Sequence, residues 1–210
     1  MVFLFLTVLI GNNISFSLSD PIQAQITVDG NTSDWDNINP IASGSGNLTS
    51  LSAAQDDENL YLLIEGISME QPYDFYLDTD NTGTTGLTSH SWSNGGADIL
   101  IQGSLIYEYT GSGQNWSWAY IGNAVISENS SAKELSVTLA QIGKNEPGDI
   151  KIGCNRGSVD YAPLAGNDMA EATILITGTL PALDVTNINT ISKKNVYISI
   201  MGQRRRSNRL

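Results

Sequence analysis

The sequence predicts an all-β fold, a single antiparallel β-sandwich of jelly-roll-like form, and three observations support that prediction. Short segments in which apolar and polar residues alternate recur from Gln25 onward, as in half-buried strands. Gly, Asn, Asp and Ser cluster between these segments, where tight turns need them. No long stretch has the 3.6-residue period of an amphipathic helix. The 210 residues are enough for one such domain.

Eight segments carry the strand pattern, and eight strands are enough for two packed sheets. They cover residues 60–64, 75–77, 98–101, 105–109, 116–120, 134–139, 150–152 and 172–176. A single helical turn is expected at residues 139–143. Pro181 is expected to end the domain, because the chain beyond it becomes rich in Asn, Thr and Ser and then basic.

The two ends of the chain differ from its centre. Residues 1–24 start with about ten apolar residues and finish on a small residue, which predicts a secretory signal peptide. The alternative is an uncleaved anchor, but the apolar stretch is too short for a bilayer core of ~30 Å. Residues 25–180 are therefore expected to be a secreted or cell-surface domain with no transmembrane segment. Residues 181–210 are expected to be a disordered tail that is polar at first and basic toward its end. The tail either attaches the protein to the cell surface or has no function.

Charge is distributed unevenly along the chain. Residues 1–132 contain 15 Asp and Glu and no Lys or Arg, whereas residues 133–210 contain all 10 basic residues and 7 acidic ones. A nucleic-acid phosphate backbone needs an electropositive face, which the first 132 residues cannot build. The acidic body instead suits hard cations or simply solubility, so no nucleic-acid partner is expected.

Few residues are available for catalysis. His90 is the single histidine, so a multi-histidine metal site is excluded, and its neighbours Ser89 and Ser91 are poorly placed to act as a nucleophile. Sequence reveals no pair of carboxylates with the separation and contrasting pKa values of a glycosidase. Cys154 has no partner for an internal disulfide and is expected to be a buried apolar residue. We therefore expect a protein that is not an enzyme.

A loop after the apolar segment 75–77 has the composition of a calcium site. Asp78, Asp80 and Asn81 supply oxygens at close spacing before Gly83, and calcium takes 6–8 oxygen ligands. Asp98 and Asp29 are further candidate ligands from neighbouring strands. The loop is not an EF-hand, because Ser89 stands where the bidentate Glu would be. The alternative is an Asx-turn loop that holds no metal.

Five motifs, in this order, resemble family 9 carbohydrate-binding modules and their DOMON-like relatives. They are an Asp-Gly-x-x-x-Asp-Trp opening, an Asp-x-x-x-Leu-Tyr strand entry, a Phe-x-Leu-Asp-x-Asp loop and two later strands, at residues 29–35, 56–61, 75–80, 96–101 and 135–139. The resemblance covers residues 26–178. It implies a jelly-roll-like sandwich with calcium in its loops and a sugar site built from aromatic rings.

The resemblance also implies site residues. Trp92 matches the position of a sugar-stacking Trp in the family and is the leading contact, with His90, Asn94 and Asp98 as polar partners. The second stacking Trp of the family is missing from residues 154–172, where only Tyr161 could replace it. His90 is alternatively a plain loop residue.

The remaining tryptophans are expected to be structural. Trp116 and Trp118 lie two residues apart and share one face of a strand, and a buried core pair is favoured over a binding surface there. Trp35 is expected to anchor the N-terminal turn in the core.

These observations predict a non-catalytic extracellular module, stabilised by Ca²⁺, that binds polysaccharide or oligosaccharide through an aromatic surface. The alternative is a structural or adhesion domain of the cell envelope that binds no sugar, which the missing second Trp and the basic tail favour. A third reading is an enzyme or a haem-binding domain of the DOMON type, in which His90 and Met69 would be the axial ligands.

Overall fold

The computed structural model of the chain describes residues 25–175, which lie within one compact unit. The expected signal peptide (1–24) and tail (181–210), together with the expected boundary at Pro181, lie outside the described residues.

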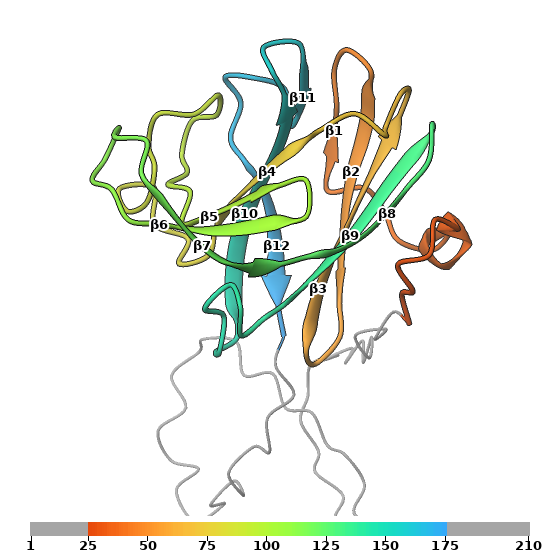
Figure 1. The fold of residues 1–210 in the computed structure, drawn as a ribbon, viewed down its shortest axis with the longest axis horizontal. Helices are drawn as coiled ribbons and strands as arrows, with labels where there is room; N and C mark the ends of the chain where they lie inside the picture. The colour runs from red at the N-terminus through yellow and green to blue at the C-terminus, as the bar shows by residue number, and fades with distance from the viewer. Residues whose placement is uncertain (1–24, 176–210) are drawn as a thin grey trace, which may run out of the picture. The chain divides into compact units, whose positions relative to one another are not determined.

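Two antiparallel sheets face each other and confirm the predicted all-β sandwich (Figure 1). The five-stranded sheet has the order β1 (Ala42–Ser43), β2 (Leu48–Gln55), β3 (Asn59–Gly66), β9 (Ala132–Thr138), β8 (Val125–Glu128). The seven-stranded sheet has the order β11 (Asp160–Ala162), β10 (Gly148–Arg156), β4 (Asp74–Asp78), β5 (Ile99–Gln102), β6 (Leu105–Tyr109), β7 (Trp118–Asn123), and β12 (Ala170–Ile174) also pairs with β10. One short 3₁₀ helix, η1, covers Thr32–Trp35.

All eight predicted strand segments overlap strands of the structure. The predicted strand at 116–120 is displaced toward the C-terminus, because β7 begins only at Trp118. Residues 139–143 form a turn, in which the Ile142 N–H donates to the Thr138 carbonyl at 3.3 Å. The strands β1, β2, β8 and β11 were not predicted.

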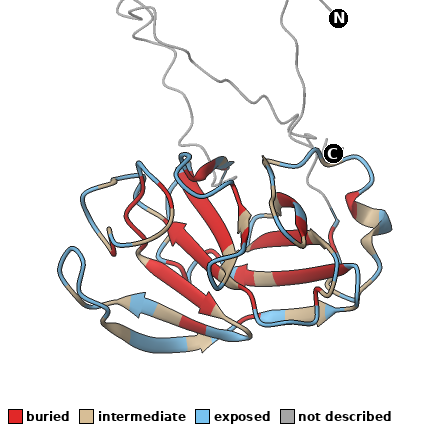
Figure 2. Cartoon of the chain, turned by 90° about the horizontal axis from the view of Figure 1, so that it is seen from above, coloured by how far each residue is buried: buried red, intermediate tan, exposed pale blue. Residues whose placement is uncertain are grey.

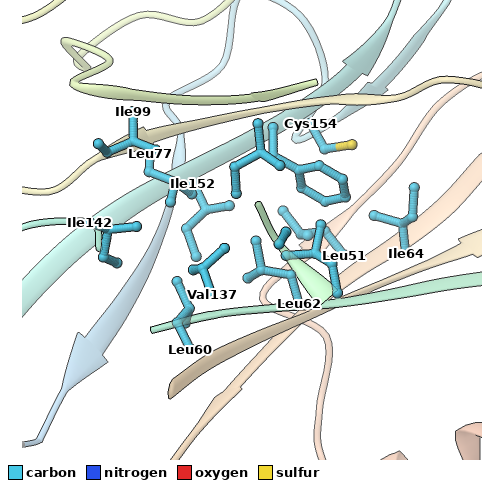
Figure 3. Close-up of a cluster of buried hydrophobic side chains, with 14 of the residues drawn as sticks. Leu51, Leu60, Leu62, Ile64, Leu77, Ile99, Val137, Ile142, Ile152 and Cys154 are labelled. Atoms are coloured by element: carbon cyan, nitrogen blue, oxygen red, sulfur yellow. The ribbon is translucent and has the colours of Figure 1, made fainter. Parts of the chain in front are cut away.

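The main core lies between the two sheets (Figure 3). Leu62 and Val137 of the five-stranded sheet and Leu77 and Ile152 of the seven-stranded sheet belong to it, and each is at most 2% exposed. Cys154 is also fully buried in this core, as expected from the sequence. Truncating one such Leu or Ile to Ala typically costs about 2–5 kcal/mol, so this layer dominates stability.

A second apolar cluster covers the outer face of the seven-stranded sheet. Phe75 and Leu77 of β4 enter the main core, and the alternation of the strand places Tyr76 on the opposite face. There the β4–β5 connection, residues 79–98, folds back so that its Leu87 and Trp92 pack on Tyr76. Buried residues are concentrated in the central strands, and exposed residues lie at the margin of the molecule (Figure 2). Every residue of β7 is half-buried or exposed.

A third cluster fixes the N-terminal turn. Trp35, at the end of η1, is 4% exposed, and its Nε1–H donates to Glu134 Oε1 at 2.9 Å. The other oxygen of this buried carboxylate accepts the Gly30 N–H at 2.6 Å. Trp35 is therefore the core anchor that the sequence predicted.

Candidate functional site

Three carboxylates converge where the β4–β5 connection leaves and rejoins the sheet. One oxygen each from Asp78, Asp80 and Asp98 lies within 4.8 Å of the other two. Asp78 ends β4, and Asp98 directly precedes β5, where its N–H donates to the Leu77 carbonyl at 2.8 Å. The antiparallel pairing of β4 and β5 thus brings together side chains that are far apart in the sequence.

The spacing of these oxygens suits a hard divalent cation. Ca²⁺ binds oxygen at 2.3–2.6 Å, so ligands on opposite sides of the ion lie up to about 4.6–5.2 Å apart. Carboxylates are the ligands that such ions prefer. Asp78, Asp80 and Asp98, three of the predicted ligands, could therefore hold a metal ion.

The other two predicted ligands, Asn81 and Asp29, are not among these three carboxylates. Asn81 lies in the same loop with an exposed side chain and a left-handed backbone (φ 55°). Asp29, the other candidate ligand, is not one of the three converging carboxylates. Its carboxylate accepts the Asn31 N–H at 2.8 Å in the N-terminal turn instead.

The electrostatics of the group favour a cation. Burial raises the pKa of Asp78 above its usual value, and hydrogen bonds from the Gly96 and Thr82 N–H groups together with the Lys151 ammonium at 3.9 Å offset this only in part. Burial also raises the pKa of Asp98, and the neighbouring carboxylates add to the effect. A bound divalent ion would compensate the cost of keeping these buried groups ionised.

Hydrogen bonds within the loop hold the carboxylates in position. The Thr82 N–H donates to Asp78 Oδ1 at 3.0 Å and to Asp80 Oδ1 at 2.9 Å. The Thr85 hydroxyl donates to Asp80 Oδ2 at 2.9 Å. These are the bonds of an Asx-type turn, so they preorganise the three carboxylates and also fit the metal-free alternative.

Trp92, the leading predicted sugar contact, is buried rather than presented on the surface. Its side chain is 5% exposed, and its Nε1–H donates to the Pro163 carbonyl at 2.8 Å. The ring lies over Gly153 of β10, where a Cβ atom would meet it at 2.8 Å. The prediction of a stacking surface at Trp92 is wrong, because the missing side chain of Gly153 makes room for the indole on the sheet.

Of the other predicted sugar contacts, His90 and Tyr161 lie beside this buried ring, whereas Asp98 belongs to the three converging carboxylates. Both nitrogens of His90 are engaged, with Nε2 at 2.8 Å from the Gly95 carbonyl and Nδ1 accepting the Trp92 N–H at 3.2 Å. Burial lowers the pKa of His90 more than its hydrogen bond to Gly95 raises it. Tyr161 is half-buried, with its ring 6.3 Å from that of Trp92, and Asn94 is exposed.

The geometry does not support the hypothesis that His90 and Met69 bind haem as axial ligands. Met69 is fully buried in the core between the sheets. His90 packs against Tyr76 on the outer face, with the two ring centroids 6.4 Å apart. The sheet therefore separates the two predicted axial ligands.

A partly exposed aromatic surface extends from the Trp92 cluster onto the outer face of β6 and β7, where Tyr107, Tyr109 and Trp118 are half-buried against that cluster. The register places Tyr107 opposite Tyr120 and Tyr109 opposite Trp118. Neighbouring ring centroids are 6.1 Å apart in the first pair and 5.1 Å in the second, and Trp116 lies 5.6 Å from Trp118. We call these five residues the aromatic row.

The aromatic row corrects the prediction of a buried Trp116–Trp118 pair. Trp116 is 59% exposed and Tyr120 is 55% exposed, whereas Trp118 is half-buried. The reason is topological, since β7 is an edge strand whose residues are all half-buried or exposed. The sequence signal was the spacing of aromatic residues at every second position in two consecutive strands, which favours one shared face.

The three converging carboxylates (Asp78, Asp80 and Asp98) and the aromatic row are linked by backbone hydrogen bonds. The Tyr109 N–H donates to the Asp98 carbonyl at 2.8 Å, and the Thr88 N–H donates to the Gly113 carbonyl at 2.9 Å. The second bond ties the β4–β5 connection to residues 110–117, the loop that carries Trp116. Ordering the connection therefore also orders one end of the row.

A cleft of ≈ 520 Å³ lies beside the three converging carboxylates. Asp80, Asp98 and Glu108 contribute acidic groups to its lining, and Ile99 and Ile142 contribute apolar surface. Glu108 was not predicted as a site residue, since its position in the strand pattern carried no signal.

The fold and this site define an all-β sandwich with two features. Three carboxylates could hold a metal ion, and a partly exposed row of aromatic rings lies on the outer face of β6 and β7. Comparison with protein-family models and with curated proteins gives no match. The resemblance to carbohydrate-binding modules therefore stays a prediction from the motifs. Within residues 25–175, no helix is both long enough and apolar enough to cross a membrane.

Proposed function

We propose that this protein is a non-catalytic, extracellular polysaccharide-binding module that contacts its ligand through the aromatic row. The observation that carries the proposal is the gathering of five aromatic side chains on one face of an edge hairpin, two of them more than half exposed. Aromatic side chains are large apolar surfaces that seldom remain uncovered together without a binding role.

The chemistry of the row suits a sugar. The C–H groups of a pyranose ring form an apolar face that stacks on an indole or phenol, while polar groups nearby bond the hydroxyls. Asn123, whose amide donates to the Tyr120 hydroxyl at 2.9 Å, and the exposed Thr110 are such polar groups at the margin of the row.

The proposed metal is Ca²⁺, and its proposed role is structural. The ion would be held by Asp78, Asp80 and Asp98 and would fasten the β4–β5 connection to the sheet. Because Thr88 joins this connection to the loop that carries Trp116, removing the ion is expected to weaken ligand binding as well as stability.

Affinity electrophoresis in gels that contain soluble polysaccharides tests the proposal. The chain should be retarded by at least one polysaccharide, and Trp116→Ala and Tyr120→Ala should each reduce the retardation at least tenfold. The matched control is Val159→Ala, which removes a 67% exposed apolar side chain on the turn between β10 and β11. Equal retardation of wild type and both aromatic variants would contradict the proposal.

A second candidate function is a structural or adhesion domain of the cell envelope. The observation in its favour is that β7, an edge strand, carries no charged residue and exposes Tyr120 and Ile121. Uncharged edges can pair with another protein chain. Retention on cell walls that survives digestion of their polysaccharides would favour this candidate over sugar binding.

A further inference from the structure

We infer that the aromatic row binds one neutral polysaccharide chain along its length, and not a crystalline surface, a charged glycan or a chain end. The inference rests on the proposed function and names the class of ligand for the same site. Three features of the row lead to it: the inclination of its rings, the charge around it and its openness at both ends.

The rings do not share a plane. The interplanar angles are 72° for Tyr107 and Tyr120, 65° for Tyr109 and Trp118, and 70° for Trp116 and Trp118. A flat crystal face would meet one ring of each pair face-on and the other edge-on, so most of the apolar area would stay uncovered. A single flexible chain can instead present the face of successive sugars to differently inclined rings.

The charge distribution disfavours an anionic glycan. Residues 25–175 contain 20 Asp and Glu against four Lys and Arg, so the described part of the chain is strongly acidic. These four cations lie on β9, on β10 and in the loop between them: Lys133, Lys144, Lys151 and Arg156. The described residues thus place no cation on β6 or β7, and uronate or sulfate groups would be repelled there.

The shape of the row favours an internal stretch of chain. The row runs from Trp116, whose ring centroid lies 5.6 Å from that of Trp118, to Tyr120, which follows Trp118 by two strand residues or roughly 7 Å at the ~3.3 Å rise of a strand. Both terminal rings, Trp116 and Tyr120, are more than half exposed. A site for a chain end would need a wall at one end, whereas this row is open at both and is longer than one sugar.

The experiment compares neutral, anionic, crystalline and end-modified polysaccharides, and two oligosaccharides, as probes of the full chain. Soluble mixed-linkage β-glucan, xylan and galactomannan serve as neutral chains, and polygalacturonate is the anionic chain. Microcrystalline cellulose is the crystalline probe, and β-glucan, xylan and galactomannan treated with borohydride have blocked reducing ends. We expect retardation by at least one neutral chain, unchanged after borohydride treatment. We also expect less than one tenth of that binding on microcrystalline cellulose or polygalacturonate, and at least tenfold weaker binding of a disaccharide than of a hexasaccharide.

The outcomes separate the inference from the proposed function. Two results overturn the inference: stronger binding to microcrystalline cellulose or polygalacturonate than to the neutral chains, and loss of binding after borohydride treatment. If Trp116→Ala abolishes the binding that is observed, either result leaves the proposed function standing. Binding to none of the probes, or binding that Trp116→Ala and Tyr120→Ala leave intact, overturns the proposed function and the inference together.

Discussion

Trp92 and Trp116 are the same side chain in opposite environments. Trp92 is 5% exposed over Gly153, whereas Trp116 is 59% exposed at the end of the aromatic row. Burial of a large aromatic ring contributes to stability, while an exposed ring contributes little to stability and is free to contact a ligand.

This contrast gives a prediction for two matched substitutions. Trp92→Ala should lower the free energy of unfolding by about 3–5 kcal/mol, because it leaves a cavity in the outer apolar cluster. Trp116→Ala should change it by less than about 0.5 kcal/mol. Denaturant unfolding of both variants measures the difference. Similar losses of stability for both variants would contradict the burial described above.

Asp160 predicts a dependence of stability on pH. Burial alone would raise the pKa of this carboxyl, but hydrogen bonds from the Asn47 N–H at 2.8 Å and from Arg156 Nε at 2.7 Å, with the Arg156 charge and the Tyr73 hydroxyl, hold it below 3.8. The folded state therefore binds this proton less tightly than the unfolded state. The resulting stabilisation is fully present well above the unfolded pKa and is lost progressively as the pH falls through the folded pKa.

The variant Asp160→Asn tests this effect. At pH 7 it should be less stable than wild type by about 2 kcal/mol, since charge-assisted hydrogen bonds are lost. The difference should shrink as the pH falls from the unfolded pKa through the lower folded pKa, where the wild-type carboxyl also loses its charge. A difference in unfolding free energy that stays constant from pH 7 to pH 2 would show that the Asp160 charge is not responsible.

At the residue scale, the sequence predicted the converging carboxylates but not the aromatic row. Asp78 and Asp80 follow a recognisable strand, and Asp98 precedes the next, so their meeting follows from strand pairing alone. The burial of Trp92 depends on Gly153, a residue of a distant strand that local patterns do not connect to it.

The β4–β5 connection is the element that a metal ion is expected to fasten. With Ca²⁺ at 100 times its dissociation constant, a bound ion would stabilise the fold by about 2.7 kcal/mol. Chelation should therefore lower the melting temperature of the wild type by several degrees. It should have no effect on Asp98→Asn, which keeps the shape of the side chain and removes the charge.

The control for this prediction is Asp36→Asn, which neutralises an exposed aspartate after η1. This variant should respond to chelator as the wild type does. Equal responses of wild type and Asp98→Asn, measured by differential scanning calorimetry with and without EDTA, would exclude Asp98 as a ligand.

Strand β10 supports the same connection through Gly153. In Gly153→Ala the new Cβ would lie 2.8 Å from ring carbons of Trp92, so the indole must shift. Overpacking of this kind costs about 1–3 kcal/mol. The variant should show that loss in denaturant unfolding together with an altered Trp92 indole resonance. Wild-type stability would indicate that the connection does not rest on this contact.

At the element scale, the strands with a continuous apolar run or a clear alternation were predicted, and those with weak patterns were not. β3 and β9 combine apolar and β-branched residues and overlap their predicted ranges. β2 has the sequence Leu-Thr-Ser-Leu-Ser-Ala-Ala-Gln, in which small residues with low β-propensity hide the pattern. β7 was displaced because Trp116 continues its alternation beyond the paired residues.

For the molecule as a whole, the fold class could be predicted because period-two alternation recurs throughout residues 25–175. The place of the aromatic row could not, because it depends on which strand ends at the edge of a sheet. A strand such as β7 has the same alternation at an edge as in the middle, and only the strand order decides whether Trp116 is covered.

The most direct test of the aromatic row uses the four indole N–H groups of the chain, which belong to Trp35, Trp92, Trp116 and Trp118. Two are bonded inside the fold, to Glu134 and Pro163, and the Trp118 Nε1–H is buried and has no acceptor among residues 25–175. In a ¹H–¹⁵N titration with a polysaccharide that retards the chain, the Trp116 and Trp118 indole signals should shift while those of Trp35 and Trp92 stay in place. A shift of the Trp92 signal with the Trp116 and Trp118 signals unchanged would contradict the account.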